Sequence, residues 1–69
     1  MKPNGPLIRA IRRGRKLSIR ELQAKTGLDR GYLSRIEREQ IHDIGDAQVR
    51  KVATALQVPE DLITDEEMT

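Results

Sequence analysis

Apolar residues recur along most of the chain at the spacing that places them on one face of an α-helix. Such a series predicts a helix that buries one side and leaves the other in water. The series are Leu7, Ile8, Ala10 and Ile11; Leu17 and Leu22; Tyr32, Leu33 and Ile36; Val49, Val52, Ala53 and Leu56; and Leu62 and Ile63. We therefore expect an all-α fold, a compact bundle of about five short helices.

Capping residues mark where the second and third helices begin and end. Ser18 and Glu21 form an S-x-x-E capping box, in which the Ser hydroxyl takes an amide of the first turn and the Glu reaches back. Gly27 stands where a left-handed residue would end this helix. Asp29 can cap the next helix through its side-chain oxygen. The pattern predicts two short helices that meet at a tight corner within residues 18–38.

The other boundaries follow from Gly, Pro and Asp. The first helix is expected from Leu7 to about Arg13, after a lead-in that Pro and Gly keep out of helix. Asp46 is expected to be the N-cap of the fourth helix, and Pro59 the first residue of the fifth. We expect residues 1–69 to form a single domain, with residues 1–6 and 65–69 flexible.

The composition narrows the class of protein. The 69 residues include no cysteine, so there is no disulfide and no thiolate metal site. The single histidine, His42, has no partner at ligand spacing, and we expect no metal and no cofactor. No nucleophile motif or Gly-rich phosphate loop is present, which argues against an enzyme. No apolar run is long enough for a signal peptide or a membrane span, so we expect a soluble, cytoplasmic protein.

Charge is divided unevenly along the chain. Residues 1–38 carry eleven Lys or Arg against three acids, whereas residues 39–69 carry two against eight. The small overall charge of +2 therefore combines a basic half with an acidic half. Segregation of this size indicates one basic face for a polyanion and an acidic face turned away from it.

The third helix carries much of the basic face. At 100° per residue its apolar residues fall on one side and its basic and small residues on the other. The second group consists of Arg30, Gly31, Ser34, Arg35 and Arg38. Three arginines and two small residues on one face suit the groove of a polyanion.

The motif L-S-x-x-E-L-x-x-x-x-G-L-D-x-x-Y-L-S-R-I-E in residues 17–37 resembles the helix-turn-helix of the phage repressor and Cro family. The resemblance extends over roughly Leu7 to Ile63 and implies a lambda repressor-like fold. In that family the helix over about residues 29–38 lies in the major groove of DNA. The resemblance implies base reading by Arg30, Gly31 and Arg35. The positions that it implies for phosphate contacts are Ser18, Arg20, Ser34 and Arg38, with Arg15 and Lys16 in the preceding turn.

The resemblance also implies an ion pair and marks some departures. Arg12 and Glu37 stand at positions that often pair in the family, which would clamp the first helix to the end of the third. The departures are Ile19 in place of a phosphate-binding Gln, Gln23 in place of a small residue, Glu39 in place of a Gly, and Ile44 about where a Pro is common.

The expected function is sequence-specific binding of double-stranded DNA by a small transcriptional regulator, of bacterial or phage origin. A homodimer on a two-fold operator is expected, with the dimer surface around the last two helices at Leu62, Ile63 or Ile44. The alternative is a protein-interaction module of the same fold, antitoxin-like or partner-binding. RNA is a weaker alternative, because one aromatic residue offers little for base stacking.

Overall fold

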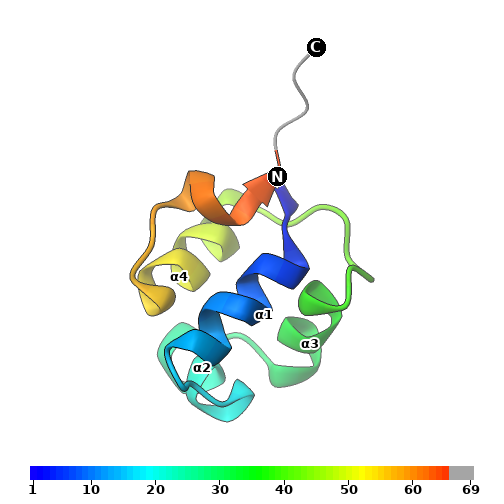
Figure 1. Cartoon of the computed structure of the whole chain (residues 1–69). Helices are drawn as coiled ribbons and strands as arrows, with labels where there is room; N and C mark the ends of the chain where they lie inside the picture. Colours follow the sequence, from blue (N-terminus) through cyan, green and yellow to red (C-terminus); the bar gives the residue numbers. More distant parts are fainter. Residues whose placement is uncertain (66–69) are drawn as a thin grey trace.

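Four α-helices, one 3₁₀ turn and a two-stranded sheet make up residues 1–65, the part of the chain that the computed structural model describes (Figure 1). The elements are β1 (Lys2–Pro3), α1 (Gly5–Gly14), α2 (Ile19–Thr26), α3 (Arg30–Glu37), α4 (Asp46–Leu56), η1 (Glu60–Ile63) and β2 (Thr64–Asp65). The mostly helical fold is confirmed. The expected fifth α-helix is wrong, because that segment forms only the short 3₁₀ turn η1.

Strand β2, directly after η1, pairs with β1 in a small antiparallel sheet, in which Lys2 lies opposite Asp65 and Pro3 opposite Thr64. The Asn4 amide donates to the Ile63 carbonyl at 2.8 Å, directly after β1. Because Thr64 is already extended, no helical ladder can continue past η1. Pro59 is the residue before the turn and not its first residue. Apart from Asp65, the expected flexible end lies outside the described residues.

Helix α1 starts at Gly5, earlier than the expected Leu7. The Asn4 side chain accepts from the Leu7 amide at 3.2 Å and caps the helix. Pro6 falls in the first turn, where its missing N–H leaves no bond unmade. At Gly5 a Cβ would overlap the backbone oxygen of Ile36 at the end of α3. The Gly and Pro that argued against helix therefore suit a first turn pressed against α3.

The core is aliphatic throughout. Helix α2 packs on α3 and α4, while α1 packs on α3 and η1. The buried apolar residues are Ile8, Leu22, Leu33, Ile36, Ile44, Val49, Val52, Ala53, Leu56 and Ile63. The expectation that Ile44 or Ile63 forms an exposed dimer surface is therefore wrong, because both residues belong to the core.

The start of α4 also differs from the expectation. Gly45 is the N-cap and has no side chain that could cap the helix, whereas Asp46 is the first helical residue. The Asp46 carboxylate is still favourable there, because it lies near the positive end of the helix dipole. None of the helices in residues 1–65 is long and apolar enough to cross a membrane.

Two departures from the family pattern lie in the loop between α3 and α4. Glu39 has φ +61°, the left-handed conformation that a Gly adopts without strain. The Ile44 amide donates to the Met1 carbonyl at 2.9 Å, a bond that Pro could not make. The free amide at Ile44 thus ties this loop to the start of the chain.

Candidate nucleic-acid interface

The corner between α2 and α3 is held by the caps that the sequence predicts. The Glu21 amide donates to Ser18 Oγ at 3.1 Å, and the Ser18 amide donates to Glu21 Oε1 at 3.1 Å. Gly27 ends α2 with φ +74°. Asp29 Oδ2 accepts from the Gly31 amide at 2.8 Å and opens α3. The capping box, the left-handed Gly and the Asp cap are confirmed.

Thr26 is a further corner residue, which the sequence analysis missed. Its hydroxyl donates to the Leu22 carbonyl at 2.8 Å and accepts from the Leu28 amide at 3.1 Å. The residue is 7% exposed, so both bonds are shielded from water. Its place directly before the helix-ending Gly27 was the available signal, because a Thr hydroxyl there can bond back to the preceding turn.

Helix α3 has one buried and one exposed side. Leu33 and Ile36 lie in the core, while Arg30, Arg35 and Arg38 are exposed. Within residues 1–65 none of these three arginine side chains makes a hydrogen bond or an ion pair. Their fifteen N–H donors are thus available to an external acceptor, five on each guanidinium.

The two small residues on this side of α3 are partly exposed. Gly31 leaves the helix surface flat between the arginines, although a Cβ there would also lie 2.9 Å from Asp29 Oδ2. Ser34 lies one turn before Arg38. The structure therefore groups Arg30, Gly31, Ser34 and Arg35 on α3, as expected, with Arg38 as the C-cap residue directly after it.

The residues expected to contact phosphate outside α3 lie in two places. Ser18 and Arg20, both exposed, stand at the N-terminus of α2. Arg15 instead reaches toward the end of α4, where its Nη2 donates to the Gln57 carbonyl at 3.4 Å. Lys16 is exposed in the same turn, with φ +57°. A hollow beside this turn is lined by Gly14, Arg15, Leu17, Lys25, Ala55 and Gln57, with no residue from α3.

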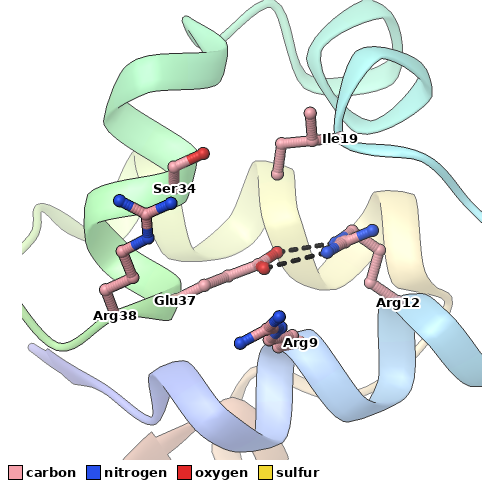
Figure 2. Close-up of a pocket in the computed structure, with 6 residues that line it drawn as sticks. All are labelled: Arg9, Arg12, Ile19, Ser34, Glu37 and Arg38. Carbon is pink, nitrogen blue, oxygen red and sulfur yellow. Dashed lines mark hydrogen bonds and ion pairs between the residues drawn. The ribbon is translucent and has the colours of Figure 1, made fainter.

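Arg12 of α1 and Glu37 of α3 form a two-pronged ion pair (Figure 2). Arg12 Nε lies 2.7 Å from Glu37 Oε2, and Nη2 lies 3.0 Å from Oε1. Arg12 Nη1 also donates to the Leu17 carbonyl at 2.8 Å. The side chains are 13% and 6% exposed. The hydrogen bond to Glu37 raises the pKa of Arg12, against the opposing effect of burial.

A hollow of about 200 Å³ lies beside this pair, lined by Arg9, Arg12, Ile19, Ser34, Glu37 and Arg38 (Figure 2). Ile19 stands at the start of α2, so all three of the first helices contribute to the hollow. Arg9 was not among the residues singled out from the sequence. In the part of the chain that is described, no group of three or more His, Cys, Asp or Glu could hold a metal ion.

Several known proteins resemble this chain over most of its length. The model of the helix-turn-helix family HTH_3 matches residues 8–63. The uncharacterized HTH-type transcriptional regulator RghRB of Bacillus subtilis (strain 168) is 34% identical over 59 residues, which cover 86% of this chain. The matched segment spans only 42% of the length of that relative.

Solved structures agree with this assignment. The restriction-modification controller protein C.AhdI from Aeromonas hydrophila is 33% identical, with a TM-score of 0.79 over 84% of this chain and 86% of its own. The N-terminal DNA binding domain of SinR from Bacillus subtilis is 31% identical, with a TM-score of 0.82 over 94% of both chains. SinR in complex with DNA matches with 32% identity and a TM-score of 0.79, over 83% of this chain and 90% of that one. The chain belongs to the helix-turn-helix family of the Cro and C1 type.

Proposed function

We propose that the chain binds double-stranded DNA in a sequence-specific manner, as a small transcriptional regulator. The observation that carries the proposal is the exposed side of α3 and its C-cap, where Arg30, Arg35 and Arg38 lie free of partners within the described residues. The similarity to SinR, whose structure in complex with DNA is known, supports the same conclusion. In this proposal α3 enters the major groove with its exposed side toward the base edges.

Base reading is assigned to Arg30 and Arg35. Each guanidinium can donate two parallel hydrogen bonds to O6 and N7 of a guanine, which is the commonest specific contact in the major groove. Gly31 between them would let the helix backbone approach the base edges. This gives the residue a role that offsets the cost of Gly in a helix, about 1 kcal/mol relative to Ala.

Phosphate contacts are assigned to residues of α2 and α3 and of the segments next to them. Ser34 lies on α3 and Arg38 directly follows it, and Ser18 and Arg20 lie at the start of α2. Contacts from Arg15 and Lys16 remain part of the proposal, although an Arg15 contact requires its weak bond to Gln57 to open. Phosphate contacts hold the protein in register on the duplex without reading its sequence.

The experiment has two stages, selection of a site and titration of variants. Bound sequences selected from a random duplex library supply the specific site and a scrambled control. We expect Arg35→Ala to cost about 1–3 kcal/mol on the specific site and to relax preference at one base pair. Arg38→Ala should weaken both duplexes alike and lower the salt slope by about one unit. Equal losses on both duplexes for Arg35→Ala would remove the base-reading assignment.

A homodimer on a two-fold site is part of the same proposal. Leu62 in η1 is the one remaining apolar residue of the expected dimer surface, and it is 47% exposed. A domain of this size buries little surface on DNA alone, so two copies on half-sites about 10 bp apart would supply the affinity. We expect Leu62→Asp to weaken cooperative binding to the full site and to leave binding to a single half-site unchanged. Equal binding of this variant and wild type to the full site would exclude Leu62 from the interface.

A protein partner is the second candidate function. SinR is also known in a complex with the protein SinI, and that structure matches this chain with a TM-score of 0.84 and 32% identity. The match covers 91% of this chain and 61% of that one. A protein-interaction module would show no salt-dependent retention of random duplex DNA, whereas the proposed regulator would be retained at low salt and released at high salt.

A further inference from the structure

The hollow between α1 and α3 concentrates positive charge at the edge of the proposed DNA-binding surface (Figure 2). Three arginines and one glutamate line it, which leaves its walls with a formal charge of +2. Ser34 and Arg38 stand on one side, and Arg9 on α1 stands across from them in Figure 2. The hollow therefore joins a residue from outside the helix-turn-helix to Ser34 of α3 and to Arg38 directly after that helix.

The charges of Arg12 and Glu37 cancel within the hollow. Both carboxylate oxygens of Glu37 accept from Arg12, and the third Arg12 contact goes to the Leu17 carbonyl. These groups are largely buried, with side-chain exposures of 13% and 6%. The pair thus forms a neutral floor of the hollow. Because its bonds to Arg12 hold the Glu37 carboxylate in place, this carboxylate does not turn toward an anion in the hollow.

The remaining polar groups of the hollow are donors without partners. Among residues 1–65, neither Arg9 nor Arg38 has an ion pair or a side-chain hydrogen bond, and the Ser34 hydroxyl has none. Two guanidinium groups and a hydroxyl around a hollow of about 200 Å³ suit a group that offers several acceptor oxygens and negative charge. A phosphate group has both properties, and a single carboxylate offers fewer oxygens.

We propose that Arg9, Ser34 and Arg38 together bind one phosphate group over the neutral Arg12–Glu37 pair. The inference rests on the proposed function when the phosphate belongs to the DNA backbone, and it assigns to Arg9 of α1 a contact outside the helix-turn-helix. A free phosphate ion offers the same chemistry, and the experiment separates the two sources.

The experiment compares Arg9→Gln with Arg13→Gln. Both variants remove one charge from an exposed position on α1, but Arg13 lines neither hollow. Wild type and both variants are titrated with a random duplex at several salt concentrations, after circular dichroism has shown equal helix content. For Arg9→Gln we expect the salt slope to fall by about 0.9 and the affinity to fall about 5–10-fold near 0.1 M salt. Arg13→Gln should change the affinity less than about twofold, since it removes only a charge whose interaction with the duplex is screened by salt.

A second arm uses inorganic phosphate without DNA. At constant ionic strength, phosphate in place of chloride should shift the NMR signals of the Arg9 and Arg38 side-chain Nε–H groups and of the Ser34 amide. The Arg13 signal should stay in place, and Arg9→Gln should remove the response of the other two residues.

The results separate the phosphate site from the proposed DNA-binding function. Duplex binding with a selective loss in Arg9→Gln supports a backbone phosphate as the ligand. Phosphate shifts without duplex binding support the site with a free ion and contradict the proposed function. Duplex binding that Arg9→Gln and Arg13→Gln weaken equally overturns the phosphate site and leaves the proposed function standing. An absence of both duplex binding and phosphate shifts overturns both proposals.

Discussion

Breaking the Arg12–Glu37 pair should be among the most damaging single changes to the stability of this chain. Both carboxylate oxygens are within 3.0 Å of the guanidinium, and the two side chains are 13% and 6% exposed. Removing one partner of a buried pair costs about 3–5 kcal/mol, because the other charge is left in a poorly solvated place. The adjoining hollow gives water a route to the pair, so we expect the lower end of that range.

The loss is large relative to the stability available. A domain of this length unfolds with roughly 3–10 kcal/mol, at about 0.05–0.15 kcal/mol per residue. A loss of about 3 kcal/mol should lower the melting temperature by about 12–24 °C, at about 4–8 °C per kcal/mol. Arg12→Met should cost more than Glu37→Leu, since Arg12 also supplies the donor to the Leu17 carbonyl.

The assay is urea unfolding followed by circular dichroism, for the two single variants and the double variant. Arg12→Met with Glu37→Leu removes both charges and fills the space with apolar groups, so it should lie within about 2 kcal/mol of wild type. The double-mutant cycle should then give a coupling energy of at least about 2 kcal/mol. Arg13→Met, an exposed change on the same helix, is the control and should stay within about 0.5 kcal/mol. Additive single losses below about 1 kcal/mol would refute the reasoning, because they would show a solvated pair.

Three further predictions concern stability and use the same assay. Gly5→Ala should destabilise the fold by about 1–3 kcal/mol, because the added Cβ would overlap the backbone of α3. The control Gly14→Ala has open space around its Cβ and should be neutral or stabilise by up to about 1 kcal/mol. Similar values for the two variants would contradict the close approach of Gly5 to α3. Thr26→Val should cost about 1–3 kcal/mol because it leaves the Leu28 amide unpaired. Thr26→Ser keeps the hydroxyl and should cost about 1 kcal/mol, and a larger loss for Ser than for Val would exclude the hydrogen bonds as the cause. Glu39→Gly should stabilise by up to about 1 kcal/mol and Glu39→Val should destabilise, since φ at this position is +61°; stabilisation by Val would show that the left-handed conformation is absent in solution.

The helix-turn-helix corner could be predicted from the sequence because its signals are local. A capping box, a left-handed Gly and an Asp cap each act within four residues, so their residue types at those spacings are sufficient evidence. The two faces of α3 followed from helical periodicity for the same reason. These local features are enough to place Arg30 and Arg35 on an exposed surface.

The features that the sequence analysis missed depend on contacts between distant parts of the chain. The pairing of β1 with β2 joins residues more than sixty apart and turns an expected helix into the 3₁₀ turn η1. Gly5 fits a helix only because the end of α3 lies against it. Ile44 and Ile63 carry no local sign of burial, since an apolar residue in a short segment can face either the core or a partner. Arg9 became a candidate only when folding placed it across from Ser34 and Arg38.

The central claim is that duplex DNA binds on the exposed side of α3 and the start of α2. The most direct measurement is NMR mapping of the amides of ¹⁵N-labelled protein during titration with a duplex selected from the random library. The largest shifts should fall on Ile19, Arg20 and residues 30–35, while the amides of α4 and η1 should change little, apart from Leu62, which we propose as a dimer contact. Shifts concentrated on α4 and η1, with residues 30–35 unaffected, would contradict the account.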